Sequence, residues 1–164
     1  MCIRDRPATA TARRAPRILL LQRRGARAVE NMDELLDALR AHPALDRWRV
    51  AMFDAEGEPL SVQASAFGGA DIVIAPHGSG LANCVWLPAV EDAPATTPPT
   101  VVELLPWGYP NLTFYVALAA LGVRHLIWIV DGADAYSSMR VDAPVLVEAL
   151  ARELTPGPGS EASL

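Results

Sequence analysis

The chain contains no lysine: all 14 of its basic residues are arginines, and 19 acidic residues outnumber them in a sequence of 164. The net charge of −5 argues against a general nucleic-acid-binding protein, because such a protein needs a basic surface to attract phosphates. Arginine without lysine, together with abundant alanine and proline, is typical of a GC-rich coding sequence. We therefore expect no nucleic-acid partner and draw no functional conclusion from the missing lysines.

Cysteine is almost as scarce as lysine. Cys2 and Cys84 form no Cys-x-x-Cys pair and no Cys/His cluster, which excludes the common zinc and redox motifs. The N-terminus has no apolar core after its charged residues and so does not resemble a signal peptide. The most apolar region, residues 114–130, is broken by Arg124 and His125, and we interpret it as a helix followed by a strand rather than a membrane span.

The two ends of the chain lack the patterns of folded structure. Residues 1–6 resemble a translated adapter scar from sequence assembly, and residues 7–15 are mostly proline, alanine, threonine and arginine without periodicity. We expect residues 1–15 to be a disordered linker or an assembly scar, with the native start missing. Residues 155–164 contain Pro-Gly-Pro-Gly-Ser and are expected to be a disordered tail. Residues 16–154 are left as one domain.

Within that domain, apolar runs alternate with helical patterns. The strands are predicted at residues 17–22, 48–53, 72–75, 101–105 and 125–130, and the helices at 31–41, 61–67, 83–87, 111–121 and 142–154. Asn31 is the predicted N-cap of the first helix. The alternation predicts an α/β fold with a doubly wound parallel sheet, in which ligands bind beyond the carboxyl ends of the strands.

A glycine-rich turn between Pro76 and Asn83 is the main candidate site. It joins a buried strand to the start of a helix, where unpaired N–H groups and the helix dipole favour an anion. Gly78 and Gly80 are expected to let a ligand approach the backbone closely, and His77 can donate a hydrogen bond or carry a proton. The alternative is an ordinary turn of an α/β protein. The turn matches neither Gly-x-Gly-x-x-Gly nor Gly-x-Ser-x-Gly.

Three charged residues near other strand ends are further candidates. If a helix begins near Arg23 and Arg27, they share one of its faces and can grip a diphosphate; otherwise they form a solvated basic turn. Glu103 lies in an apolar strand, where a lone carboxylate must be paired or must face solvent or ligand at the strand end. It therefore either accepts both hydroxyls of a ribose or forms a salt bridge with a nearby arginine. Tyr109, in a Gly-Tyr-Pro turn, is the best candidate for stacking on a base.

These residues, taken in order, resemble the carboxy-terminal half of glycosyltransferase family 61. The resemblance rests on Arg23, Arg24, Arg27 and Asn31, on Gln63, on the stretch Ala70 to Asn83 with its His-Gly-Ser-Gly-Leu-Ala-Asn block, and on Val101 to Leu104. It covers roughly residues 16–150. The family usually has alanine where Ser79 stands and often threonine where Ala82 stands, and both changes are small. The family fold has two Rossmann-like domains facing across a cleft, and only the second is expected here.

The resemblance implies an inverting glycosyltransferase of the GT-B type that uses a nucleotide-sugar donor, with UDP the expected nucleotide. The donor-binding residues that it implies are Arg23, Arg27, His77, Gly78, Ser79, Gly80, Leu81, Asn83 and Glu103. The arginines and turn amides suit the charge that builds on a departing diphosphate. No Asp-x-Asp motif is present, and we expect neither a required metal ion nor a tightly bound cofactor.

The expected partners are the donor, a glycan or glycoprotein acceptor, and a missing N-terminal domain of the same chain. The general base is unidentified; His77 is a candidate, and a chain with this half alone is expected to be inactive. One alternative is a non-catalytic nucleotide-binding α/β module, and another is a flavodoxin-like domain. Eukaryotic members of the family are mostly anchored in the Golgi or endoplasmic reticulum lumen by an N-terminal segment, and bacterial members are cytoplasmic.

Overall fold

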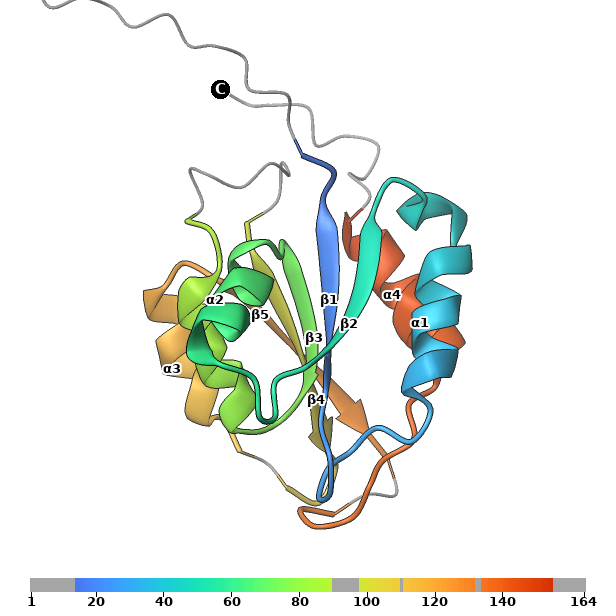
Figure 1. Cartoon of the computed structure of the whole chain (residues 1–164). Helices are drawn as coiled ribbons and strands as arrows, with labels where there is room; N and C mark the ends of the chain where they lie inside the picture. Colours follow the sequence, from blue (N-terminus) through green and yellow to red (C-terminus); the bar gives the residue numbers. More distant parts are fainter. Residues whose placement is uncertain (1–13, 90–97, 110, 132–133, 155–164) are drawn as a thin grey trace, which may run out of the picture.

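The computed structural model describes residues 14–89, 98–109, 111–131 and 134–154, and these form an α/β domain (Figure 1). Its five strands are β1 (Arg17–Gln22), β2 (Arg49–Asp54), β3 (Ile72–Pro76), β4 (Thr100–Pro106) and β5 (Arg124–Val130). All of the strand pairs are parallel, in the order β2-β1-β3-β4-β5. The predicted α/β class and parallel sheet are confirmed, and the arrangement is Rossmann-like.

Helices cover both faces of this sheet. The α-helices are α1 (Met32–Ala41), α2 (Leu60–Gly68), α3 (Thr113–Ala120) and α4 (Ala143–Leu154), with two 3₁₀ helices, η1 (Pro43–Leu45) and η2 (Ser79–Trp86). In Figure 1, α1 and α4 lie on one face and α2 and α3 on the other. Among the described residues, no helix is long and apolar enough to cross a membrane.

The central strands are buried on both faces because each carries a nearly continuous apolar run. In β1, Ile18 and Leu20 pack toward α1 and α4, whereas Leu19 and Leu21 join the cluster on the α2 and α3 side. This division follows the two-residue period of a strand, which sends successive side chains to opposite faces. Every residue of β3 and β4 is buried, Glu103 included. A charge at the centre of such a strand needs partners, and the tertiary structure provides them.

Asn31 occupies the predicted N-cap position of α1, and its backbone carbonyl accepts from Leu35 N at 3.1 Å. Its side chain makes no capping hydrogen bond. Instead its Nδ2 donates to Val141 O at 2.8 Å, and its Oδ1 accepts from Val141 N at 3.0 Å. The buried backbone before α4 would otherwise lack partners, and the amide matches both of its groups. Asn31 therefore joins the starts of two neighbouring helices, a long-range role that the local sequence does not reveal.

The helix after β3 is also different from the prediction. The expected α-helix is a 3₁₀ helix, and its first turn closes when Leu81 N donates to Gly78 O at 3.0 Å. The Leu81 amide is therefore not a free donor, and its side chain is buried. The N–H groups of Ser79 and Gly80 precede this first bond and keep the orientation expected at a helix start.

Candidate functional site

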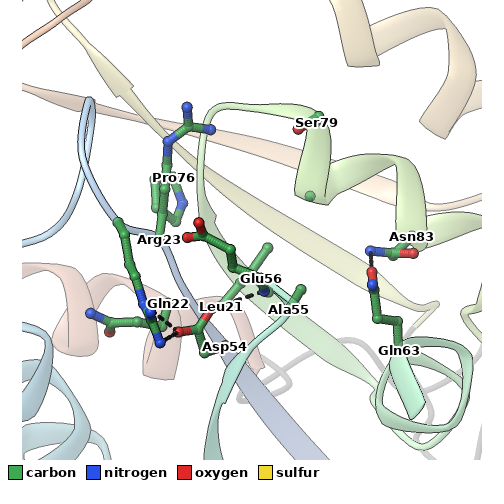
Figure 2. Close-up of a pocket in the computed structure, with 12 residues that line it drawn as sticks. Leu21, Gln22, Arg23, Asp54, Ala55, Glu56, Gln63, Pro76, Ser79 and Asn83 are labelled. Atoms are coloured by element: carbon green, nitrogen blue, oxygen red, sulfur yellow. Dashed lines mark hydrogen bonds and ion pairs between the residues drawn. The ribbon is translucent and has the colours of Figure 1, made fainter. Parts of the chain in front are cut away.

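A pocket of about 410 Å³ lies where the strand order reverses (Figure 2). From β1 the sheet continues to β2 on one side, and from β3 it continues to β4 on the other. Parallel sheets bind their ligands at such a switch point, beyond the carboxyl ends of the strands. The lining residues come from the ends of β1, β2 and β3 and from α2 and η2: Leu21, Gln22, Arg23, Arg24, Asp54, Ala55, Glu56, Gln63, Pro76, Ser79, Gly80 and Asn83.

The structure divides the predicted donor-binding residues into two groups. Arg23, Ser79, Gly80 and Asn83 line the pocket. The remaining five are not among its lining residues; they are Arg27, His77, Gly78, Leu81 and Glu103. Arg27 and Glu103 of this second group contact His77, and His77 and Gly78 contact Arg23. These contacts join the two groups.

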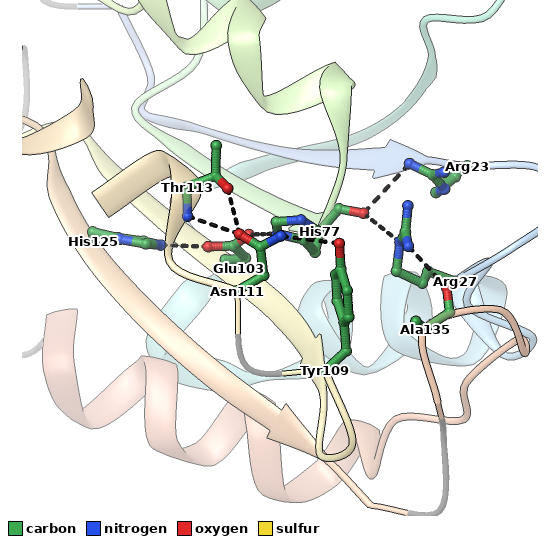
Figure 3. Close-up of polar contacts among 9 residues, drawn as sticks. All are labelled: Arg23, Arg27, His77, Glu103, Tyr109, Asn111, Thr113, His125 and Ala135. Atoms are coloured by element: carbon green, nitrogen blue, oxygen red, sulfur yellow. Dashed lines mark hydrogen bonds and ion pairs between the residues drawn. The ribbon is translucent and has the colours of Figure 1, made fainter. Parts of the chain in front are cut away.

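The two arginines converge on a single backbone atom. Arg27 Nε donates to His77 O at 3.0 Å, and Arg23 Nη1 donates to the same oxygen at 3.4 Å (Figure 3). Arg23 Nε also donates to Ala26 O at 2.6 Å, and Arg27 Nη1 donates to Ala135 O at 2.8 Å. Burial, followed by the nearby Arg27 charge, lowers the pKa of Arg23, as expected for two cations held close together.

The reason predicted for this convergence was wrong. Both arginines lie in the loop after β1, well before α1 begins at Met32, so they do not share a helix face. Arg27 has φ of 61°, an uncommon value for a residue with a side chain. The shared carbonyl of His77, and not helical spacing, brings the two guanidinium groups together.

Both glycines of the turn make room for side chains from the end of β1. A Cβ atom on Gly78 would lie 1.8 Å from Arg23 Nη1, and one on Gly80 would lie 2.8 Å from Leu21 Cδ2. Contacts that short do not occur between real atoms, so Arg23 rests directly on the backbone of Gly78. The close approach that the sequence suggested for a ligand is made, at Gly78, by an arginine of the same chain.

Glu103 is completely buried, and its carboxylate lies between two histidines. His77 Nδ1–H donates to one oxygen, and His125 Nε2–H donates to the other at 2.8 Å (Figure 3). Glu103 therefore neither faces solvent at a strand end nor pairs with an arginine, the two environments that the sequence suggested. A carboxylate only accepts hydrogen bonds, so each imidazole directs an N–H toward it.

The strand register explains why these three side chains meet. Glu103 is paired with Ala75, two residues before His77, and Val101 is paired with His125. Since paired positions and positions two apart share a face, all three side chains project to the same side of the sheet. His125 was missed as a partner. The available signal was a buried acid and a histidine on neighbouring strands. Whether their side chains share a face depends on the register of the strands, which had to be known first.

His77 is 5% exposed and is fixed through its backbone and its ring. Its N–H donates to Leu104 O at 3.0 Å, which extends the β3–β4 ladder by one bond. The rings of Tyr109 and Phe114 meet the imidazole edge-on at 5.3 and 5.7 Å. Tyr109 also lies 5.3 Å beneath the Arg27 guanidinium, so in this structure its ring contacts protein groups.

Five further polar residues line the pocket that were not proposed as donor-binding residues from the sequence: Gln22, Arg24, Asp54, Glu56 and Gln63. Asp54 is held by Arg24, whose Nε donates at 2.9 Å, and by the Glu56 N–H at 3.0 Å. The Glu56 N–H and, less strongly, Arg24 lower the pKa of Asp54. Gln63 Oε1 accepts from Asn83 Nδ2 at 2.8 Å, which joins two parts of the predicted motif. Gln22 Oε1 is buried without a hydrogen-bond partner among the described residues.

Among the described residues, no group of three or more histidine, cysteine, aspartate or glutamate side chains is arranged to hold a metal ion. The pocket instead offers arginine guanidinium groups, backbone N–H groups and side-chain amides. This donor set binds oxyanions through charge and hydrogen bonds.

Comparison with known proteins relates this chain to a family of glycosyltransferases. The model of glycosyltransferase 61 matches residues 3–97, which include β1, both arginines and the glycine turn but not Glu103 or His125. A beta-1,2-xylosyltransferase, XAX1, of Oryza sativa subsp. japonica is 31% identical over 93 residues. An alpha-1,3-arabinosyltransferase, XAT3, of the same organism is 29% identical over 96 residues.

Each of these alignments covers 57% of the chain and 14% of the relative. The aligned part of the chain therefore corresponds to a small part of either rice protein. Because the family model matches more than half of the chain, and its match includes Arg23, Arg27 and the His-Gly-Ser-Gly turn, the chain belongs to glycosyltransferase family 61.

Proposed function

We propose that this chain forms the donor-binding half of an inverting GT-B-type glycosyltransferase, and that its pocket holds the diphosphate of a UDP-sugar. The observation that carries the proposal is the meeting of Arg23 with Ser79 and Gly80 at the switch point of the sheet. Family membership supports a nucleotide-sugar donor, and the names of the two relatives make xylose and arabinose the first sugars to test.

The groups around Arg23 suit a diphosphate better than an uncharged ligand. Arg23 uses Nε and one Nη1 hydrogen on backbone oxygens, which leaves the N–H groups of Nη2 for a ligand. The N–H groups of Ser79 and Gly80 add neutral donors on the opposite side of the pocket. Together they would stabilise the negative charge that grows on the nucleoside diphosphate as the bond to the sugar breaks.

In the proposed reaction an acceptor hydroxyl attacks the anomeric carbon as the diphosphate leaves from the opposite face. This single displacement inverts the configuration, and a general base must take the proton of the hydroxyl. We do not assign this base to His77, because its side chain is almost completely buried and is not among the pocket-lining residues. We place the base, with the binding site of a glycan or glycoprotein acceptor, in the other Rossmann-like half.

Glu103 also receives a different proposed role. Both of its carboxylate oxygens are bound by histidines, so we do not assign it to the ribose hydroxyls. Glu56 lines the pocket, and among the described residues no side-chain hydrogen bond to its carboxylate is present. We propose Glu56 as the group that accepts the ribose hydroxyls. Gln22 Oε1, a buried acceptor to which no described residue donates, is suited to a donor group on the nucleoside.

Calorimetry with UDP on the 164-residue chain tests the donor site. We expect binding that weakens at least about tenfold in Arg23→Ala, since an arginine–phosphate contact of this kind contributes about 1.5–3 kcal/mol. Arg47→Ala is the matched control, because Arg47 is exposed and precedes the start of β2, whereas the pocket lies at the carboxyl end of that strand. Equal losses in the two variants, or no binding by the well-folded chain, would refute the donor-site assignment. Repeating the titration with EDTA tests whether binding requires a metal ion.

The second candidate is a non-catalytic nucleotide-binding module. It is favoured by the position of His77, the one candidate base, outside the pocket lining. Hydrolysis or transfer of a UDP-sugar by a protein with both halves would distinguish the two, because a module would bind UDP without turnover.

For a eukaryotic source we propose a Golgi or endoplasmic reticulum lumenal location, and for a bacterial source the cytoplasm; a fluorescent fusion of the full gene product tests this.

A further inference from the structure

We infer that Glu103 is a positioning residue for the donor site, acting through His77 to fix the two arginines that bind the diphosphate. This inference rests on the proposed function, because it concerns the same arginines. Glu103 lies outside the matched part of the family model and does not line the pocket. Its effect would be transmitted by a short chain of contacts, each of which is present in the structure.

The first contact anchors the imidazole. Glu103 and the side chain of His77 are almost completely buried, and the His77 Nδ1–H bond to the carboxylate is a charge-assisted bond in an apolar environment. Two rings, Tyr109 and Phe114, close around the imidazole edge-on. His125 holds the second carboxylate oxygen at 2.8 Å, so the carboxylate cannot rotate without losing a buried hydrogen bond.

The second contact passes from the ring of His77 to its backbone. The N–H of His77 is bound to Leu104 on the strand that carries Glu103, so both ends of the residue are attached to β4. The His77 carbonyl then points to the loop after β1, where it accepts from Arg23 and Arg27 (Figure 3). This oxygen is the one acceptor that both guanidinium groups share among the described residues.

Such an anchor is needed because the two cations repel each other. The charge of Arg27 contributes to the lowered pKa of Arg23, and the chain between them is a loop with an unusual φ at Arg27. Neither helical spacing nor an acidic side chain in contact with both holds them together. A displaced His77 carbonyl would let the arginines separate, and the diphosphate would lose part of a preorganised site.

The test compares Glu103→Gln with Val102→Ala in the 164-residue chain. Gln keeps the size of the side chain but has a single acceptor oxygen and no charge, so one histidine loses its charge-assisted bond and must change tautomer to accept from the amide. Val102 is buried on the other face of the same strand, and its truncation lowers stability without touching the histidines. We expect both variants to melt earlier, but only Glu103→Gln to weaken UDP binding, by about tenfold, the loss expected for one charge-assisted bond.

Uridine separates a change at the arginines from a general loss of the pocket. It lacks the diphosphate, so its binding, followed by chemical-shift titration, should be equal in Glu103→Gln and wild type. Side-chain N–H signals provide a readout without any ligand. The Arg27 Nε–H signal should shift and exchange faster in Glu103→Gln, while Arg14, which is bound to Asp71, should keep its signal. An unchanged Arg27 signal overturns the inference.

A third variant covers the possibility that Glu103→Gln does not fold. His77→Phe/Glu103→Leu/His125→Phe replaces the buried polar group with apolar side chains, and such replacements are often neutral or stabilising. We expect near wild-type melting with UDP affinity still reduced about tenfold or more. Full recovery of UDP affinity would show a purely structural role and would refute the inference. If wild type does not bind UDP, the proposed function fails, and the Arg27 signal still decides the positioning role.

Discussion

Replacing Gly78 with alanine should displace Arg23 from the donor site while leaving the rest of the fold intact. The Arg23 guanidinium packs against the backbone of Gly78, and the Cβ of an alanine at this position would occupy the space that the guanidinium now fills. The substitution removes no charge; it adds one methyl group and some backbone strain, because Gly78 has φ of 156°. Its effect on UDP binding therefore measures the position of Arg23 and not its presence.

The size of the displacement follows from the distances. The new Cβ would lie 1.8 Å from Arg23 Nη1, whereas ordinary contact begins at 3.4 Å, so the group must retreat by about 1.6 Å. The bonds to Ala26 O and His77 O, at 2.6 and 3.4 Å, do not both survive such a movement. Arg23 is partly exposed, so we expect a stability loss of about 1–2 kcal/mol and a 10- to 100-fold weaker affinity for UDP.

Calorimetry with UDP and urea unfolding together measure both effects. Gly122→Ala is the matched control: Gly122 follows α3 with φ of 68°, so alanine there costs about 1 kcal/mol in backbone strain away from the pocket. The control should lose stability and keep its affinity for UDP. If Gly78→Ala binds UDP as tightly as the control does, Arg23 is not held against Gly78 in the functional protein, and the geometry of the donor site is wrong.

Three other perturbations test separate parts of the structure. Asn31→Ala should reduce the free energy of unfolding in urea by about 2–4 kcal/mol, because both backbone groups of Val141 lose a buried partner, and Asn31→Asp should cost at least as much, because its second oxygen would face the acceptors Val141 O and Glu34 Oε2. Burial, and then the charge of Glu103, raises the pKa of Cys84 to about 12, so iodoacetamide at about pH 8 should label this thiol only after unfolding; rapid labelling of the native protein would contradict its burial. The pKa of Asp54 is lowered in the folded state, so its contribution to stability is present above about pH 4 and is lost as the pH falls through the lowered value; Asp54→Asn should reduce that acid sensitivity, measured as urea unfolding at several pH values, and an unchanged profile would refute it.

Much of the fold could be predicted because each strand corresponds to a local apolar pattern in the sequence. The predicted strand at residues 17–22 coincides with β1, and the other four strands begin or end within a residue or two of their predicted positions. Continuous apolar runs such as Ile18 to Leu21 are required of strands that are covered on both faces. Local patterning failed where tertiary contacts decide the outcome. Asn31 is a typical N-cap residue and occupies that position, but its side-chain amide bonds to the buried backbone of Val141, 110 residues away.

The candidate site was predictable as a set of residues but not as an arrangement. The motif named Arg23, the glycine turn and Asn83, and the pocket contains all three. It also named Glu103, for which the sequence allowed a ribose or an arginine as partner. Its actual partners, His77 and His125, depend on which positions of three strands share a face, and that is set by the register of the sheet.

The sequence alone determined that this protein has alternating strands and helices, a glycine-rich turn after a buried strand, and membership in its family, since these depend on short-range patterns of side chains. Only the tertiary structure decided which side chains pack against the glycines, where the arginines converge and which groups hydrogen-bond to Glu103. Those outcomes are contacts between loops and strands separated by 22 (His125 and Glu103) to 59 (Gly80 and Leu21) residues. The packing of the sheet brings such groups together, and no local preference of the chain specifies it.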